Sequence, residues 1–157
     1  MKHIFIINPK SGKEEVKKEL ISELKKYDNK IDYEIYITKS IKDATKYVDD
    51  YCNNYKDDIT FYACGGDGTL NEVVNGAMNH KNAIVSVYPC GSGNDFVKVY
   101  GGKDKFLNIN NLINGIETKI DVMKVNETYS VNVTNMGFEA SVCDIANKVR
   151  RKKNYWW

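Results

Sequence analysis

The feature that most constrains the fold is a glycine-rich stretch between an apolar run and a helix-like run. Residues 65–69 read Gly-Gly-Asp-Gly-Thr, after the apolar run Ile59–Cys64 and before the run Leu70–Met78. Glycines leave backbone N–H groups uncovered, and a helix N-terminus favours negative charge. A strand, a glycine turn and a helix in this order are typical of a phosphate-binding loop. Asp67 adds a carboxylate for phosphate-bound Mg²⁺, although a plain surface turn is the alternative for this stretch alone.

The stretch differs from the two commonest phosphate-binding signatures. No Gly-Lys-Ser/Thr closes it, which excludes a Walker P-loop. If Gly66 and Gly68 are the first pair of G-x-G-x-x-G, Asn71 occupies the place of the third glycine. A functional interpretation therefore needs support from the rest of the chain.

Three further apolar runs also end in small or polar residues. Ile4–Ile7 is followed by Asn-Pro-Lys-Ser-Gly at 8–12, Ala83–Tyr88 by Pro-Cys-Gly-Ser-Gly-Asn-Asp-Phe at 89–96, and Tyr33–Ile37 by Thr38. Helix-like stretches alternate with these runs, which predicts a three-layer α/β/α fold with a mostly parallel sheet. Ligands of such sheets bind outside the carboxyl ends of the strands, so we expect these turns to form one site.

The helix-like stretches carry apolar stripes at helical spacing. The first has Val16, Leu20, Ile21, Leu24 and Tyr27 on one face, the second starts at Ser40, and a short one covers 108–114. A capping box of Ser11 with Glu14 is predicted for the first helix, and this role is compatible with a phosphate contact by Ser11.

With these turns the chain resembles the catalytic domain of the diacylglycerol kinase family of lipid kinases, including its bacterial members. That family carries Asn-Pro-x-Ser-Gly, Gly-Gly-Asp-Gly-Thr-x-Asn-Glu and Pro-x-Gly-Thr-x-Asn-Asp-Phe in this order. The first two motifs are matched at 8–12 and 65–72, and the third at 89–96 with Ser92 in place of threonine. The resemblance implies an ATP-dependent lipid kinase that phosphorylates the hydroxyl of diacylglycerol or a related lipid, with ATP and Mg²⁺ as cofactors.

The resemblance also implies the roles of individual residues. Asp67 is the expected catalytic residue and metal ligand, because it orients Mg²⁺ and hence the γ-phosphate. The implied nucleotide-binding residues are Asn8, Pro9, Lys10, Ser11, Gly12, Thr38, Gly65, Gly66, Gly68, Thr69, Leu70, Asn71, Glu72 and Ser92. Acidic residues such as Glu72 are also common early in helices for dipole reasons alone.

The pattern changes near Gly115. Alternating residues at 119–125 and 129–133, around Asn126-Glu127, predict an antiparallel hairpin, and 140–153 is helix-like. We therefore expect a nucleotide-binding α/β domain at 1–115 and, at 116–157, the incomplete start of a β-rich lipid-substrate domain. The resemblance implies that the chain is truncated and that its general base lies beyond Trp157. Residues 1–157 are then expected to bind nucleotide, to be a poor lipid kinase, and to self-associate through the exposed hairpin.

Composition bounds the class of protein. The 157 residues are 42% hydrophobic and 28% charged, as in a globular domain, and a net charge of +2 does not indicate nucleic-acid binding. Without an apolar run of membrane-spanning length or a signal peptide, we expect a cytoplasmic protein that meets its lipid at the inner membrane surface. The four cysteines, Cys52, Cys64, Cys90 and Cys143, lack metal-site spacing and are expected to be free thiols, with Cys90 packed rather than reactive. His3 and His80 are expected on the surface.

Two alternatives remain open at this point. An NAD kinase also has a Gly-Gly-Asp-Gly-Thr loop on a similar fold, but the turn at 8–12 and the pair Asn71-Glu72 favour the lipid branch. A non-catalytic nucleotide-binding remnant is the second alternative. The acceptor lipid stays open as well, because diacylglycerol, phosphatidylglycerol, ceramide and sphingoid bases are all acceptors of related domains.

Overall fold

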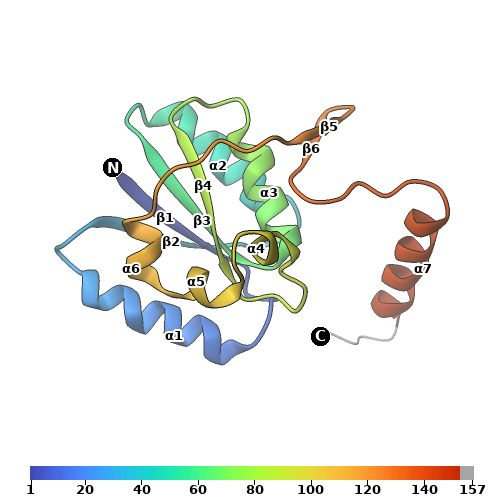
Figure 1. The fold of residues 1–157 in the computed structure, drawn as a ribbon, viewed down its shortest axis with the longest axis horizontal. Coiled ribbons are helices and arrows are strands. Elements are labelled where there is room, and N and C mark those ends of the chain that lie inside the picture. Colours follow the sequence, from blue (N-terminus) through green and yellow to red (C-terminus); the bar gives the residue numbers. More distant parts are fainter. Residues whose placement is uncertain (153–157) are drawn as a thin grey trace.

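The computed structural model describes residues 1–152, without the side chains of residues 147 and 150–152. Its centre is a parallel four-stranded sheet in the order β2-β1-β3-β4 (Figure 1). The strands are β1 (Lys2–Ile7), β2 (Asp32–Ile37), β3 (Ile59–Gly65) and β4 (Ala83–Pro89). Because β2 lies on one side of β1 and β3 on the other, the chain changes direction between β1 and β3. The predicted parallel α/β fold is confirmed.

Helices cover both faces of the sheet. The longer helices are α1 (Glu14–Leu24), α2 (Asp43–Asn54) and α3 (Asp67–Ala77), and the short ones are a 3₁₀ turn (Lys25–Tyr27), α4 (Asp95–Val99), α5 (Lys103–Leu107) and α6 (Ile109–Ile113). In Figure 1, α2 and α3 lie on one side of the sheet, and α1 and α6 lie on the other. This arrangement gives the three layers that the sequence predicts.

Two apolar clusters, one on each face, hold the layers together. On β1, Ile4 and Ile6 pack with α2 and α3, whereas Phe5 and Ile7 pack with α1 and α6. Successive strand residues point to opposite faces, so a strand that is covered on both sides is apolar throughout. Phe5 stacks on Tyr62 of β3 with ring centroids 4.3 Å apart. The two central strands therefore form a buried layer that fixes the positions of their carboxyl ends.

Several local predictions from the sequence are wrong. The Ser11–Glu14 capping box does not form, because Lys13 is the N-cap of α1 and no side chain caps it. Helix α2 begins at Asp43 rather than Ser40. Helix α3 begins at Asp67 rather than Leu70, so the Gly-Asp-Gly stretch belongs to the helix start.

The predicted surface position of the histidines is also wrong. His3 is buried, and its Nδ1 lies 2.8 Å from the hydroxyl oxygen of Tyr62. Burial lowers the pKa of His3 below its ordinary value. The side chain of His80 is only 13% exposed, with Nε2 2.7 Å from Asp49 Oδ1. Both rings are structural groups of the fold.

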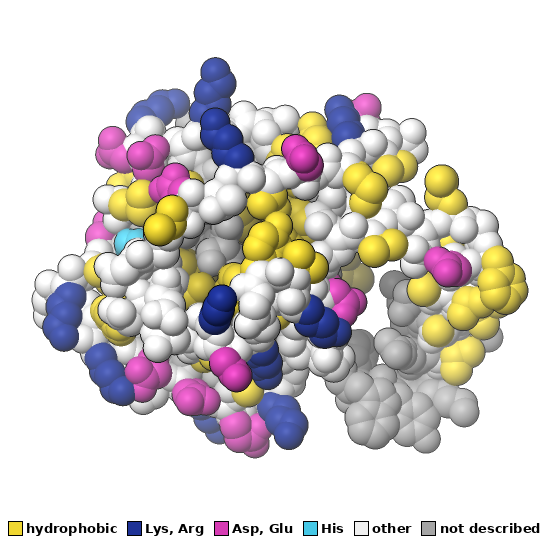
Figure 2. All heavy atoms as spheres, in the orientation of Figure 1, with side chains coloured by type: hydrophobic (Ala, Val, Ile, Leu, Met, Phe, Trp, Pro, Cys, Tyr) yellow, Lys and Arg dark blue, Asp and Glu magenta, His cyan; other side chains and the backbone are white. Residues whose placement is uncertain are grey.

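The segment after α6 forms a hairpin and one more helix. Strands β5 (Met123–Val125) and β6 (Thr128–Ser130) pair antiparallel and form a hairpin that is shorter than predicted. Asn126 in the turn has a φ of 53°. Helix α7 (Phe138–Lys152) begins earlier than predicted, and Lys153, the predicted last residue, lies outside the described residues. Figure 2 shows hydrophobic side chains gathered where α7 lies. Phe138, the first residue of α7, is 82% exposed. Among residues 1–152, no helix combines the length and the apolar character that crossing a membrane requires.

The contact between α2 and α3 yields a stability prediction at Gly76. A Cβ built on Gly76 lies 2.5 Å from the backbone oxygen of Thr45 and 2.8 Å from Val48 Cβ. Alanine in place of glycine in a helix ordinarily stabilises by up to about 1 kcal/mol, but overpacking against backbone costs about 1–3 kcal/mol. We expect Gly76→Ala to lower the free energy of unfolding in urea by about 1–3 kcal/mol.

Gly68→Ala is the matched control, because nothing lies within 4 Å of a Cβ at Gly68. This variant is expected to be as stable as the parent or slightly more stable. A Gly76→Ala chain that gains stability, as Gly68→Ala does, contradicts the close helix contact.

Candidate functional site

The carboxyl ends of the central strands bring the predicted turns together at one edge of the sheet. Ile7 pairs in register with Cys64, and Gly65 pairs with Pro89. The three turns that follow β1, β3 and β4 therefore start side by side. This edge contains the point between β1 and β3 where the chain changes direction, which is the usual ligand position in open α/β sheets.

Asn8 ties the first turn to the start of α3. Its backbone N–H donates to Cys64 O at 3.1 Å, and its side-chain Nδ2 donates to Thr69 Oγ1 at 3.1 Å. Its Oδ1 accepts the backbone N–H of Lys10 at 3.0 Å, which shapes the turn itself. The side-chain atoms of Asn8 and the buried hydroxyl of Thr69 therefore hold the two turns against each other.

Glycines allow the turns to touch through their backbones. Gly12 has a φ of +66°, and a Cβ there falls 1.7 Å from Cys90 O. A Cβ on Gly91 falls 2.5 Å from the Cα of Gly66. The carbonyl of Gly65 accepts the N–H groups of Cys90 and Gly91 at 2.9 and 3.2 Å. Much of the glycine content of the motifs thus serves packing between turns.

The N-terminus of α3 is the part of the site that can receive an anion. Gly66 is its N-cap, and the carbonyl of Gly66 accepts the N–H groups of Thr69 and Leu70 at 3.0 and 3.1 Å. The first backbone N–H groups of a helix, here those of Asp67 and Gly68, have no intrahelical acceptor and form the positive end of the helix dipole. The space beside Gly68 is open. A phosphate can therefore approach the backbone here.

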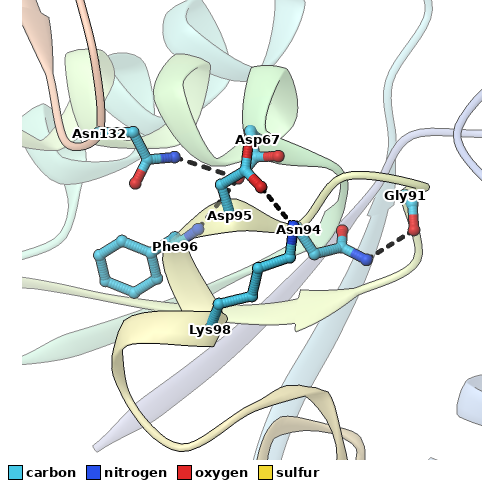
Figure 3. Close-up of polar contacts among 7 residues, drawn as sticks. All are labelled: Asp67, Gly91, Asn94, Asp95, Phe96, Lys98 and Asn132. Carbon is cyan, nitrogen blue, oxygen red and sulfur yellow. Dashed lines mark hydrogen bonds and ion pairs between the residues drawn. The ribbon is translucent and has the colours of Figure 1, made fainter.

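Asp67 is held by groups from two other segments (Figure 3). Its Oδ1 accepts the backbone N–H of Phe96 at 3.3 Å and the Nδ2 of Asn132 at 3.1 Å. Its other oxygen, Oδ2, lies 3.1 Å from the position of a Cβ on Gly93 and has no hydrogen-bond donor within the described part of the chain. One oxygen is thus fixed, and the second is available to a ligand.

Asp95 and Lys98 form an exposed ion pair next to Asp67, with Lys98 Nζ 2.6 Å from Asp95 Oδ1 (Figure 3). The hydrogen bond to Asp95 raises the pKa of Lys98, and the charges of Asp95 and Asp67 add to this effect. Among the described residues, no three His, Cys, Asp or Glu side chains gather as a metal cage. Mg²⁺ commonly binds through one or two carboxylates, water and substrate phosphates, so a single free carboxylate oxygen fits that ion.

The other predicted site residues differ in their exposure and in their contacts. Ser11 Oγ lies 3.7 Å from the position of a Cβ on Gly66, and Ser92 is exposed at the edge of the third turn. Thr38 follows β2, and its N–H donates to Ile7 O at 2.9 Å. Pro9 presents its carbonyl to Lys17 Nζ at 2.5 Å, and Lys10 is exposed beside it.

Three predicted site residues lie differently from the expectation. The side chain of Leu70 is buried in the core, so only its backbone belongs to the site. A helix that started at Leu70 would hold Asn71 and Glu72 in its first turn, but because α3 begins at Asp67 they lie in its second turn. The carbonyl of Glu72 accepts Thr45 Oγ1 at 2.8 Å, which directs this part of the helix toward α2.

Sequence reasoning missed two buried residues beside the turns. Lys17 is buried, and its Nζ lies 3.3 Å from Glu14 Oε2 as well as near Pro9 O. Asn94 has a φ of 51°, and its Nδ2 donates to Gly91 O at 2.6 Å. Its Oδ1 is the only buried side-chain oxygen or nitrogen of the described residues without a hydrogen-bond partner. The buried lysine follows helical spacing from Leu20 and Leu24, but the pattern alone does not distinguish it from the exposed lysines around it.

Cys90 has the packing position that was predicted for it. It is buried beneath the first turn, and burial raises the pKa of its thiol to about 11 although Lys17 and Lys103 act in the opposite direction. Cys52, Cys64, Cys90 and Cys143 are free thiols, as predicted, and of these only Cys143 is exposed.

Comparison with known proteins identifies the family. Residues 2–125 match the diacylglycerol kinase catalytic domain. The chain belongs to this family. Two diacylglycerol kinases of Staphylococcus aureus, from strains bovine RF122 / ET3-1 and MRSA252, are each 38% identical over 137 residues, which cover 85% of this chain and 42% of the relative.

The fold agrees with the family assignment. A solved structure of a diacylglycerol kinase from Bacillus anthracis str. Sterne superimposes with a TM-score of 0.67 at 27% sequence identity. The superposition covers 82% of this chain and 45% of that one. The chain thus spans less than half the length of these relatives, and its matched part contains the sheet and the three turns.

The buried thiols and phenols of the α/β domain predict a pH dependence of stability. Burial raises the pKa of Cys52 and of Cys90 to about 11, and it also raises the pKa of Tyr62 and Tyr88. A group whose pKa is raised by folding keeps its proton in the native state, whereas the unfolded chain loses protons above about pH 8.5 for cysteine. We expect the free energy of unfolding to be constant from pH 7 to 8 and to fall as the pH rises from about 8.5 toward 11.

Urea unfolding at several pH values measures this effect. Cys52→Ala is expected to reduce the decrease in the free energy of unfolding with pH. Cys143→Ala, which alters an exposed side chain, is expected to leave this decrease unchanged. A stability that rises with pH in this range contradicts the burial of these groups.

Proposed function

We propose that this chain binds Mg²⁺ and ATP at the edge formed by the three turns, for transfer of the γ-phosphate to the hydroxyl of diacylglycerol or a related lipid. The observation that carries the proposal is the N-terminus of α3, which presents free backbone N–H groups and the open side of Gly68 next to Asp67. Membership of the diacylglycerol kinase catalytic domain family supports the choice of a lipid as the acceptor.

Phosphate binding rests on the backbone of the three turns. The N–H groups at the start of α3 and the dipole of that helix attract the phosphates. Ser11 and Ser92 border this space from the first and third turns, so their hydroxyls are proposed to bind phosphate oxygens, and Thr38 is proposed to contact the nucleotide from the end of β2. Asn8, Gly12 and Gly65 act indirectly, because they hold the turns in place.

Asp67 presents an electrostatic conflict that a cation resolves. A carboxylate beside phosphate groups repels them, and the attraction of the helix dipole decreases within about one helical turn. Asp67 Oδ2 would hold a divalent cation, whose charge would offset this repulsion. When bound, Mg²⁺ neutralises the charge that develops on the phosphates during transfer. The fixed Oδ1 of Asp67 holds the ligand oxygen in a constant direction.

The acceptor side is proposed to lie beyond the α/β domain. We place the domain boundary near residue 115 and take β5, β6 and the segment to residue 157 as the beginning of a β-rich lipid-substrate domain. The protein is proposed to act at a membrane surface, where its lipid acceptor resides. The exposed apolar residues of α7, such as Phe138 and Ile145, are proposed to support self-association, which light scattering of the purified chain tests.

Binding of nucleotide tests the first part of the proposal. We expect calorimetric titration to show that the parent chain binds Mg·ADP. Asp67→Asn is expected to lose about 1.5–3 kcal/mol of binding free energy, which is about tenfold to hundredfold in affinity. The asparagine keeps the size of the side chain but removes the charge that attracts the cation. In EDTA, ADP is expected to bind Asp67→Asn at least as tightly as the parent, because the variant no longer repels the phosphates.

Asp50→Asn is the matched control, because Asp50 is an exposed carboxylate on α2. It is expected to bind Mg·ADP as the parent does. A parent chain without any heat of nucleotide binding rules out the proposed function.

The acceptor is tested by joining the matched part of this chain to the rest of a relative. We expect a chimera with residues 1–125 in place of the matching part of the Staphylococcus aureus relative to transfer radiolabelled phosphate from ATP to diacylglycerol in mixed micelles. The isolated chain is expected to be at least about a hundredfold slower, because unpositioned reactants lose this much or more. Asp67→Asn in the chimera should remove the activity. A folded chimera that phosphorylates NAD and not lipid contradicts the proposal.

A further inference from the structure

The second strand of the hairpin, β6, lies beside α3 and is held there by the side chain of Asn75. The N–H of Tyr129 donates to Asn75 Oδ1 at 2.9 Å, and Asn75 Nδ2 donates to Tyr129 O at 2.9 Å. The side-chain amide thus exchanges both hydrogen bonds with one backbone residue, as a neighbouring strand does. Asn75 Nδ2 also donates to Asn71 O at 2.8 Å, which holds the amide against its own helix.

The same segment reaches Asp67 a few residues later. Asn132 Nδ2 donates to Asp67 Oδ1 at 3.1 Å. Asp67 and Asn75 lie on the same helix about two turns apart, so residues 129–132 run along α3 from its second half back to its first turn. Between the two contacts, Val131 packs against the apolar cluster of α2 and α3. The segment is therefore fastened at both ends and in the middle.

We infer that Asn75 and Asn132 form a latch that positions the Asp67 carboxylate for its ligand. The inference rests on the proposed function of Asp67. Asn132 is a positioning residue, because it acts through Asp67. Without Asn132, Oδ1 keeps only the 3.3 Å bond from Phe96 N, and the carboxylate is free to turn its second oxygen away from the phosphate space.

The latch also connects two regions that the sequence separates. Asp67 belongs to the glycine-rich start of α3, while Asn132 follows the hairpin, at a separation of 65 residues in the chain. A displacement of the segment after the hairpin would move Asn132 and so change the orientation of the Asp67 carboxylate. The orientation of Asp67 thus depends on how residues 129–132 dock, and Asn75 controls that docking.

A purely structural role is the alternative for both asparagines, and a double-mutant cycle separates the two. Mg·ADP affinity is measured by calorimetry for the parent, Asn132→Leu, Asp67→Asn and the double variant. We expect Asn132→Leu to lower Mg·ADP affinity about tenfold, as for the loss of one hydrogen bond to a charged group, without changing the affinity for ADP in EDTA. In the Asp67→Asn background, Asn132→Leu should have no further effect, because the two residues act as one unit.

Asn135→Leu is the matched control, since Asn135 is exposed on the same segment and has no hydrogen bond among the described residues. It should bind Mg·ADP as the parent does. Equal losses from Asn132→Leu in both backgrounds, or the same loss in EDTA, overturn the positioning role.

The remote half of the latch is tested at Asn75 by amide hydrogen exchange. Asn75→Leu is expected to speed exchange of the Tyr129 N–H about tenfold, because that group loses its acceptor, and to lower Mg·ADP affinity to the extent seen for Asn132→Leu. Asn79→Leu, at an exposed position after α3, should change neither quantity.

The possible results distinguish the latch, the positioning role and the proposed function. Faster exchange at Tyr129 with unchanged Mg·ADP affinity overturns the positioning role, and unchanged exchange overturns the latch itself. A parent chain that binds no Mg·ADP overturns the proposed function and this inference together. A parent that binds Mg·ADP while the cycle is additive overturns the inference alone.

Discussion

Backbone contact between the three turns at the edge of the sheet is the constraint on which the rest of the structure depends. A side chain at Gly12 would strike Cys90 O, and a side chain at Gly91 would strike the Cα of Gly66. These contacts bring the turns after β1, β3 and β4 within hydrogen-bond reach of one another, as the pair Asn8–Thr69 shows. Because β1 and β3 are buried on both faces, the strand ends that carry the turns are fixed in position. The direction in which α3 leaves the sheet is therefore fixed as well.

This constraint divides the glycines of the motif into two kinds by their surroundings. A Cβ on Gly65 would meet the side chain of Thr69, and one on Gly66 would lie near the Cα of Gly91, whereas Gly68 faces open space beside the free N–H groups of the helix start. The packing glycines bring the turns together, and the open glycine leaves room for an anion. A substitution at Gly12 is therefore expected to act on the architecture, while one at Gly68 acts on the approach of the phosphate.

Asp67 connects the edge formed by the three turns with the segment beyond the sheet. Its Oδ1 receives Phe96 from the third turn and Asn132 from the segment after the hairpin, so three parts of the chain meet at one carboxylate. The orientation of this carboxylate therefore depends on the positions of its two donors, and the direction of its second oxygen depends on them as well. The matched part covers 42% of the Staphylococcus aureus relative. In this chain, the contact joins the edge formed by the three turns to the residues that follow the sheet.

The sequence by itself determined the parallel α/β fold, the order of strands and helices, and the turns that form the site. These depend on local patterns: apolar runs for buried strands, helical spacing for α1 to α3, and small residues at strand ends. Only the tertiary structure decided that α3 begins at Asp67, that Leu70 and His3 are buried, and that Asn132 reaches Asp67. The physical reason is that burial, capping and hydrogen bonds of this kind depend on groups far apart in the chain, whose proximity exists only after the sheet has formed.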